Sequence, residues 1–319
     1  MKTIIVTGGA GFIGSHLCEK LMERGNRVIC VDNLLTGSQK NIAHLLIKDN
    51  FAFIQADVSE KVQDKYLKNI DEVYHFASPA DPNTHSPFSY MNFPFETMRV
   101  NTMGTWRLCE LALKNNAKLL FSSTSEVYGD PKESPQNENY RGNVSSIGPR
   151  SVYDESKRFG ETIISAFVRN KKLDGRITRI FNTYGPKMNP NEGRAVVNFI
   201  KQALKGQPIT IYGSGEQTRS FCYIDDQVEG QILAMEKGQV GEVFNIGNPD
   251  ERTIQEFAQM IKKLSKSKSE IVYSEPLPED DPLQRKPDIT KAKRLLGWEP
   301  KIGLEIGLKK TIDYFLAIL

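Results

Sequence analysis

Residues 3–14, TIIVTGGAGFIG, combine a short β-branched run with a glycine-rich turn and the start of a helix. The run Thr3–Thr7 predicts a buried strand, and Ile13, Leu17 and Leu21 recur at helical spacing. A strand, a glycine turn and a helix in this order are typical of the first unit of a doubly wound parallel sheet.

The glycine turn predicts a binding site for a dinucleotide pyrophosphate. Its tight bend requires positive φ, the backbone must approach a phosphate closely, and the helix must pack against the strand. The helix N-terminus adds unpaired N–H groups and the positive end of the helix dipole. A glycine-rich turn without a ligand is the alternative. The predicted phosphate contacts are Gly8, Gly11, Phe12, Ile13 and Gly14.

Asp32 indicates which dinucleotide is bound. It ends the second predicted strand, where an acidic side chain accepts hydrogen bonds from the adenosine ribose hydroxyls. A carboxylate there repels a 2′-phosphate, which favours NAD over NADP; capping of the following turn is the alternative. Asp57, after the third strand, is either an adenine contact or a turn residue. The remaining predicted cofactor contacts are Asn33, Val58 and Ala77.

Apolar runs at residues 27–32, 51–57, 72–77, 118–122 and 176–181 alternate with helical stretches near 96–113 and 152–169. This alternation predicts an α/β doubly wound parallel sheet, a Rossmann fold, with helices on both faces. Beyond Asn182, prolines separate shorter elements, which include helices at 196–204, 253–264 and 304–316. We therefore expect an NAD-binding domain over residues 1–182. A smaller α/β substrate-binding lobe covers 183–319, with part of 216–245 returning to the first domain.

Composition argues against several other classes of protein. The 319 residues include 42 basic and 39 acidic side chains, and a net charge of +3 predicts neither a nucleic-acid partner nor a membrane partner. No apolar stretch approaches the roughly 20 residues that a membrane span requires. The four cysteines are widely spaced without a CxxC pair, which fits a reducing cytoplasm, and the four histidines have no metal-ligand spacing. No metal is expected.

Tyr153 and Lys157 stand four residues apart in a predicted helix, so their side chains share one face. A phenol has a pKa of about 10, and a nearby ammonium and the oxidised nicotinamide both favour the phenolate. Lys157 can also donate to the nicotinamide ribose. Thr124, at the carboxyl end of a predicted strand, can bridge the reacting oxygen and Tyr153. Strand-end hydroxyls that only satisfy backbone groups are the alternative.

Several longer motifs carry a family resemblance. They are GGAGFIGSHL, VDN, HFASPA, STSEVYGDP, IGPRSVYDESKR, RIFNTYGP, IYGSGEQTRSFCYIDD and DDPLQRKPDITKAKRLLGWEP. Together they resemble the extended short-chain dehydrogenases, and among these the UDP-glucuronate decarboxylases. The resemblance covers nearly the whole chain and implies a tightly held NAD, a UDP-sugar substrate and a homodimer. The loop 81–95 departs from the family's usual segment.

The resemblance also implies roles for individual residues. Thr124, Ser125 and Glu126 occupy the catalytic triplet, with Tyr153 and Lys157 as the dyad. A buried Glu126 is expected to have its pKa raised toward neutrality and to handle protons. The implied contacts to the UDP-sugar are Arg150 and Arg285 at the sugar carboxylate, Asn182 and Arg219 at the diphosphate, and Tyr212 at the uracil; Arg285 also assists decarboxylation.

The implied reaction is NAD-dependent decarboxylation of UDP-glucuronate to UDP-xylose. Tyr153 acts as base, a 4-keto sugar forms, and hydride returns from NADH. A nucleotide-sugar 4,6-dehydratase is one alternative, but those enzymes carry Asp-Glu where this chain has Ser125-Glu126. A UDP-sugar 4-epimerase needs no counterpart of Glu126. A non-catalytic NAD-sensing protein is a remote alternative, because it needs no base such as Tyr153.

Overall fold

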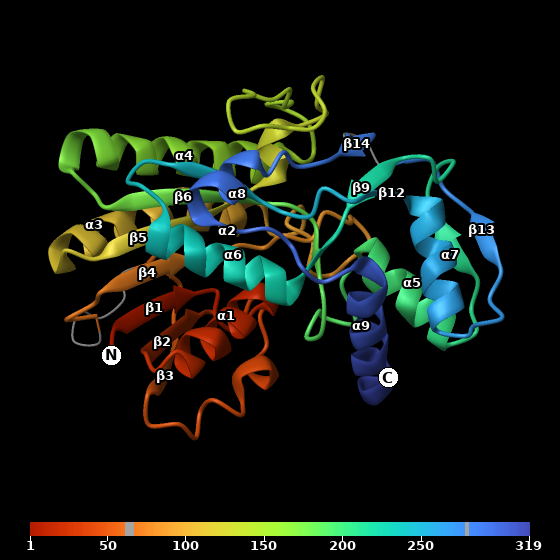
Figure 1. Ribbon diagram of the computed structural model, residues 1–319, viewed down its shortest axis with the longest axis horizontal. Helices are drawn as coiled ribbons and strands as arrows, with labels where there is room; N and C mark the ends of the chain where they lie inside the picture. Colours follow the sequence, from red (N-terminus) through yellow and green to blue (C-terminus); the bar gives the residue numbers. More distant parts are fainter. Residues whose placement is uncertain (61–66, 278–280) are drawn as a thin grey trace.

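Seven strands form the central sheet, in the order β11-β6-β5-β4-β1-β2-β3, and each neighbouring pair runs parallel (Figure 1). The computed structural model describes residues 1–60, 67–277 and 281–319, so Asp280, in the last motif quoted above, lies outside it. The sheet strands are β1 (Thr3–Thr7), β2 (Arg27–Asp32), β3 (Phe51–Gln55), β4 (Glu72–His75), β5 (Lys118–Thr124), β6 (Gly175–Ile180) and β11 (Val243–Ile246). The predicted Rossmann fold is confirmed.

Alternation along the strands divides the core between the two faces of the sheet. In β1, Ile4 and Val6 belong to one buried cluster and Ile5 to another, as expected for side chains that alternate with a period of two. The first cluster packs against α1 (Phe12–Glu23) and α6 (Ile224–Lys237). The second packs against α3 (Thr105–Asn115) and α4 (Ser151–Lys171) on the opposite face (Figure 1). Helices therefore cover both faces.

The sheet has its topological switch point at β1, which pairs with β2 on one side and β4 on the other. The chain thus leaves β1 and β4 in opposite directions, and ligands bind in the crevice that opens there at the carboxyl ends of the strands. Strands β3 and β4 end two residues earlier than the sequence predicts, at Gln55 and His75. Asp57 and Ala77 consequently lie in the loops that line this crevice.

The predicted helix near residues 96–113 is a run of three helical segments: α2 (Pro94–Arg99), a π-helical turn over Val100–Gly104, and α3. The predicted helix near 152–169 is α4, which begins directly after Arg150. Within the described ranges, no helix is long and apolar enough to cross a membrane, the 21-residue α4 included.

The second lobe is built around α5 (Ala195–Leu204), α7 (Ile254–Leu264) and α9 (Leu304–Ile318). Its short strands are β7 (Thr183–Tyr184), β8 (Ile209–Ile211), β9 (Thr218–Ser220), β10 (Cys222–Tyr223), β12 (Glu251–Thr253), β13 (Ile271–Tyr273) and β14 (Gln284–Arg285). Between β10 and β12 the chain returns to the sheet through α6 and β11, and α8 (Thr290–Leu296) packs against both. One buried cluster runs from β1 to α9, so the two lobes share a core.

Candidate active site

A cavity of about 410 Å³ opens between the carboxyl edge of the sheet and the second lobe. It brings together residues from both halves of the chain. Among the described residues, its lining includes every predicted site residue except Arg285: Gly8, Gly11, Phe12, Ile13, Gly14, Asp32, Asn33, Asp57, Val58, Ala77, Thr124, Ser125, Glu126, Arg150, Tyr153, Lys157, Asn182, Tyr212 and Arg219.

The glycine turn fits a dinucleotide. Gly8 has φ +70°, and a Cβ on it would lie 2.6 Å from the Ala77 amide nitrogen, so only glycine is tolerated between β1 and the loop after β4. Gly11 is the N-cap of α1, and among the described residues no side chain caps the helix there. The first-turn N–H groups of α1 therefore remain available to an anionic ligand.

The Asp32 carboxylate lies beneath this turn at the end of β2. Its Oδ2 accepts a hydrogen bond from the Ala10 amide (3.0 Å), and its Oδ1 accepts one from the Leu34 amide (2.8 Å). Burial raises the pKa of Asp32, and the two amides oppose that shift. The predicted capping of the turn is thus present. Because Asp32 also lines the cavity, the ribose contact stays a prediction.

Asp57 shows a similar arrangement in the loop after β3. Its Oδ1 accepts hydrogen bonds from the amide and the hydroxyl of Ser59, at 2.8 and 2.6 Å. Its Oδ2 accepts one from Asn33 Nδ2 at 3.1 Å. These bonds join the loops after β2 and β3 at the edge of the cavity. Asp57 is therefore a turn residue here, and its contact with adenine remains a prediction.

Helix α4 places the dyad inside the cavity. Lys157 Nζ donates to the Ser122 carbonyl at 2.7 Å, and burial lowers the pKa of Lys157 to about 7. Burial also raises the pKa of Tyr153 above its ordinary value, although the neighbouring Thr124 hydroxyl acts in the opposite direction. The sequence predicted a lower pKa for this phenol. The protein groups alone do not lower the pKa of Tyr153, because desolvation of the phenolate outweighs the effect of the groups that favour it.

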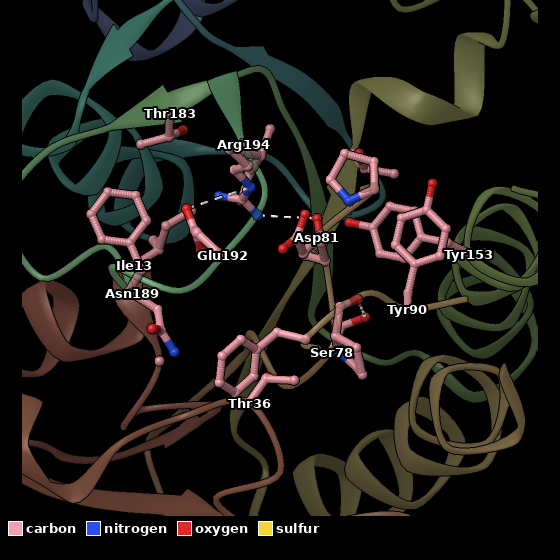
Figure 2. Close-up of a pocket in the computed structure, with 18 of the residues that line it drawn as sticks. Ile13, Thr36, Ser78, Asp81, Tyr90, Tyr153, Thr183, Asn189, Glu192 and Arg194 are labelled. Atoms are coloured by element: carbon pink, nitrogen blue, oxygen red, sulfur yellow. Dashed lines mark hydrogen bonds and ion pairs between the residues drawn. The ribbon is translucent and has the colours of Figure 1, made fainter. Parts of the chain in front are cut away.

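Sequence reasoning missed Tyr90, whose ring stacks on Tyr153. The ring centroids are 4.8 Å apart and the planes differ by 10° (Figure 2). Tyr90 is 1% exposed and lines the same cavity. It comes from the loop 81–95, which the sequence predicts to differ from the usual segment of the family it resembles. That expected difference is the one available signal, since an irregular loop has no periodicity that could reveal a buried tyrosine.

Glu126 lies at the end of β5 in a single 3-10 turn, Ser125–Tyr128, capped by Thr124. Its Oε2 accepts hydrogen bonds from Arg150 at 2.7 Å and from Arg285 at 3.2 Å. Burial alone would raise the pKa of Glu126, but Arg285, Arg150 and Arg219 together lower it to about 2. The expectation of a raised pKa is therefore wrong. The carboxylate is ionised and neutralised by arginines.

Arg285 lies apart from the other predicted site residues. Its side chain is 1% exposed, and among the described residues it is not part of the cavity lining. Its guanidinium donates to the carbonyls of Ser125 and Gly129 and to Glu126. All three acceptors belong to or flank the turn after β5. In this structure Arg285 thus supports the Ser125–Glu126 turn from beneath, and its contact with the sugar carboxylate stays a prediction.

Arg150 and Arg219, by contrast, face the cavity and are joined by one carboxylate. Asp281 accepts from Arg150 Nη1 at 3.1 Å and from Arg219 Nη2 at 2.8 Å. The two arginines therefore form one positive region at the end of the cavity that faces the second lobe. Tyr212 and Asn182 line the same cavity. Sequence reasoning gave Asp281 no role, although it lies in the last motif quoted above.

A further charged group comes from the segment before α5. Figure 2 shows Arg194 between Glu192 and Asp81, with its Nε 4.0 Å from Glu192 Oε1. Burial raises the pKa of Glu192 to about 7. All three residues line the cavity, and none was predicted. Within residues 1–60, 67–277 and 281–319, no group of three or more His, Cys, Asp or Glu side chains is placed to hold a metal ion.

Known proteins resemble this chain along nearly its whole length. UDP-glucuronic acid decarboxylase 1 of Danio rerio is 50% identical over 314 residues, which make up 98% of this chain and 72% of that protein. The enzyme of the same name from Arabidopsis thaliana is 47% identical over 312 residues, 98% of this chain and 69% of that protein.

Solved structures agree with this relationship. The UDP-glucuronic acid 4-epimerase of Bacillus cereus, in complex with UDP-glucuronic acid and NAD, has a TM-score of 0.88 and 33% identity, covering 99% of this chain and 100% of that one. The UDP-glucose 4-epimerase of Thermotoga maritima, with UDP-glucose, has a TM-score of 0.87 and 34% identity, covering 99% of both chains.

The family model that matches this chain covers most of the sheet and the cavity. It is described as the NAD dependent epimerase/dehydratase family and matches residues 4–247. The glycine turn and the Tyr153–Lys157 dyad lie within this span, whereas the cavity lining also includes Ile254, Leu277 and Asp281 beyond it. The chain belongs to the NAD-dependent epimerase/dehydratase family of extended short-chain dehydrogenases.

Proposed function

We propose that this protein is an NAD-dependent UDP-glucuronate decarboxylase that forms UDP-xylose through a 4-keto intermediate. One observation carries the proposal. The glycine turn, the Tyr153–Lys157 dyad and the positive region at Arg150 and Arg219 line a single cavity, so a dinucleotide and an anionic sugar nucleotide can meet at Tyr153. The relatives named UDP-glucuronic acid decarboxylase support the choice of reaction.

Within this cavity, Tyr153 is the group that takes the proton from the C4 hydroxyl of the sugar. Thr124 lies beside it and favours the phenolate. Lys157 holds its ammonium against the Ser122 carbonyl, at 5.8 Å from the Tyr153 ring. A phenol that must lose its proton near neutral pH needs such positive charge close by.

NAD, held by the glycine turn and Lys157, would supply the redox chemistry for the transient oxidation at C4. A carboxylate β to the resulting ketone loses carbon dioxide because the electrons of the breaking bond delocalise into the carbonyl group. The protein needs only to hold the sugar in the aligned conformation and to protonate C5. The proposed contacts to the UDP-sugar are Asn182, Tyr212, Arg150 and Arg219.

Ser125 favours decarboxylation over 4,6-dehydration. An aspartate at this position would face the sugar carboxylate, and two like charges about 4 Å apart repel by roughly 4 kcal/mol at an effective dielectric constant near 20. Serine has no such charge. The neighbouring Glu126 is negative, but its Oε2 is already bound by Arg150 and Arg285, so its charge is neutralised before a substrate arrives.

We also propose a homodimer in the cytoplasm. Helices α2, α3 and α4 and the π-helical turn over Val100–Gly104 carry exposed large apolar side chains on the face of the sheet away from α1, namely Phe95, Met103, Trp106 and Phe159. Large exposed apolar patches mark protein interfaces, so we place the dimer contact on these helices. The four cysteines are free and buried, which suits a reducing compartment. Light scattering of the protein and of Phe159→Glu tests the dimer.

For the two lobes we propose the division suggested by the sequence. Residues 1–182, together with α6 and β11, would bind NAD, and the remainder of 183–319 would bind the UDP-sugar. The pairing of β11 with β6 supports this assignment of the returning segment. NAD and UDP titrations of variants in each part would test it.

One assay tests the function. The protein is incubated with NAD and UDP-glucuronate, and release of carbon dioxide and formation of UDP-pentose are measured, with UDP-glucose as the control substrate. We expect carbon dioxide and UDP-xylose from the acid and no pentose from UDP-glucose. A 4-epimerised uronate without carbon dioxide would instead identify an epimerase.

A further inference from the structure

The loop between β4 and α2 covers the catalytic tyrosine. It carries Tyr90, whose buried ring lies parallel to the Tyr153 ring with centroids 4.8 Å apart. Within the described residues, the Tyr90 hydroxyl has no hydrogen-bond partner, so no hydrogen bond of this hydroxyl fixes the ring in the cavity. One face of the Tyr153 ring is therefore shielded from water by this loop.

Asp81 makes several of the hydrogen bonds that hold the loop in this position. The Tyr90 amide donates to the Asp81 carbonyl at 3.1 Å, which closes the loop on itself. The Asp81 carboxylate makes two more bonds: Oδ1 accepts from the Asn83 amide at 3.1 Å, and Oδ2 accepts from the Gly193 amide at 2.8 Å. Asp81 is 4% exposed and lines the cavity.

The bond to Gly193 fastens the loop to the second lobe, because Gly193 lies between β7 and α5. Asn83 Nδ2 donates to the Gly193 carbonyl at 2.9 Å, so the loop binds this peptide segment from both sides. A Cβ on Gly193 would overlap the Asn83 side chain, and only glycine allows this approach. Arg194 Nη2 donates in turn to the Ala80 carbonyl at 3.0 Å.

A positively charged side chain lies next to the Asp81 carboxylate. The guanidinium of Arg194 lies between Asp81 and Glu192 (Figure 2), so a positive group faces each buried acid. Each carboxylate oxygen of Asp81 also accepts a hydrogen bond from a backbone amide, so neither is left without a partner. Asp81 thus connects the loop between β4 and α2 to the second lobe, next to Arg194, which faces the cavity.

We propose that Asp81 is a positioning residue for the reaction: by binding Gly193 it holds Tyr90 on Tyr153 and keeps the base covered. This inference rests on the proposed function only in taking Tyr153 as the base. Loss of the Asp81 carboxylate frees the loop, admits water to Tyr153 and lets its ring move. Catalysis depends on the placement of such groups to within about 1 Å.

The test compares three variants in the full-length protein. Asp81→Ala removes the acceptor, and Asp81→Asn keeps one oxygen for the Gly193 amide. Asp71→Ala is the matched control, since Asp71 at the other end of β4 also accepts a backbone amide hydrogen bond, from Thr3 at 2.7 Å, far from the cavity. Three quantities are measured: kcat, UDP affinity, and phenolate absorbance of Tyr153 against pH, with Tyr153→Phe as the blank.

We expect Asp81→Ala to lower kcat roughly tenfold while UDP affinity stays within about twofold. Because burial raises the pKa of Tyr153, uncovering it moves its titration to lower pH. The charged or titratable groups around Tyr153 are Lys157, Asp154, Glu126, Arg194 and Tyr90, and all are retained in the three variants. Asp81→Asn restores most of kcat and the original titration, and Asp71→Ala changes neither.

A folded Asp81→Ala variant with the kcat and the Tyr153 titration of the unmodified protein overturns the proposal. So does a loss of kcat that follows thermal stability alone while the titration is unmoved, because a merely structural residue gives that result. The phenolate titration needs no substrate. It therefore tests Asp81 even if the unmodified protein releases no carbon dioxide, an outcome that counts against the proposed function only.

Discussion

The Arg285 guanidinium lies directly beneath Glu126, 3.2 Å from its carboxylate oxygen, although the two residues are 159 positions apart in the sequence. Arg150 binds the same oxygen from the cavity side at 2.7 Å. Glu126 is thereby held as an anion between two arginines. The turn after β5 consequently has little net charge of its own, and a negatively charged sugar can approach it.

Glu126→Gln should destabilise the protein in a pH-dependent way. The pKa of Glu126 is lowered to about 2 in the folded protein, so its contribution is fully present above the unfolded pKa of 4.5 and is lost as pH falls through 2. We expect a loss of up to about 3 kcal/mol at pH 7. Urea unfolding at a series of pH values measures it.

Glu155→Gln provides the control for Glu126. It removes the same charge from an exposed pair with Arg158 on α4, where the effect on unfolding should be small. If Glu126→Gln were as stable as Glu155→Gln at pH 7, or if its deficit grew as the pH fell from 5 to 3, the arginine cluster would not hold Glu126 ionised.

Tyr153→Phe should abolish reduction of bound NAD by UDP-glucuronate, because the substitution removes the phenolic oxygen that takes the proton from the sugar. General-base catalysis contributes about 10²–10⁴-fold. The ring remains and still stacks on Tyr90, so the fold and UDP affinity should be unchanged. Stopped-flow absorbance of NADH measures the step. Normal turnover by a correctly folded Tyr153→Phe protein would remove the dyad from the mechanism.

Lys157→Met should be inactive and yet more stable. Burial lowers the pKa of Lys157 to about 7 from 10.5, so folding at neutral pH forces an unfavourable environment on the ammonium. The resulting loss in the free energy of unfolding grows as pH falls from 10.5 to about 7 and is constant at lower pH. We expect about 3 kcal/mol of added stability at pH 7, after subtraction of the hydrogen bond to Ser122.

The pH dependence identifies the cause of that gain. The difference between Lys157→Met and the unmodified protein should shrink as pH rises toward 10.5, whereas Lys171→Met, at the exposed end of α4, should show no such trend. A Met variant that is less stable at every pH would show that the ammonium is well solvated in the folded protein.

Asp32→Asn should weaken the preference for NAD over NADP. The charge that repels a 2′-phosphate is lost, while the amide oxygen can still accept the hydrogen bond from Leu34. We expect the ratio of NADP to NAD affinity to rise roughly tenfold, about 1.4 kcal/mol. Isothermal titration with both dinucleotides gives the ratio. An unchanged ratio would restrict Asp32 to capping the turn.

The fold was predictable because local patterns determine it. The run Thr3–Thr7, the glycines after it and the four-residue spacing of Tyr153 and Lys157 each act within one or two elements, and the structure places all of them as expected. Parallel strands with helical crossovers then leave few possible arrangements. The dyad and the glycine turn meet in one cavity because this arrangement brings the carboxyl ends of the parallel strands to one edge of the sheet.

The electrostatics of the site could not be predicted in this way. The pKa of Glu126 depends on Arg285, which reaches it only through the tertiary fold, and burial without those arginines would give the opposite sign. Tyr90 and Asp81 belong to an irregular loop whose course is fixed by a bond to Gly193 in the other lobe. No periodicity or motif carries that information.

Strand β11 has a practical consequence for anyone who wishes to transplant the nucleotide-binding half of this enzyme. It completes the sheet beside β6, and α6, which leads to it, covers α1 and binds Arg24 through Glu229 and Glu236 at 2.7 and 3.0 Å. A gene cut after Asn182 would expose β6 as a bare edge, open to intermolecular pairing. A transferable module must therefore be spliced from two separate stretches of the chain.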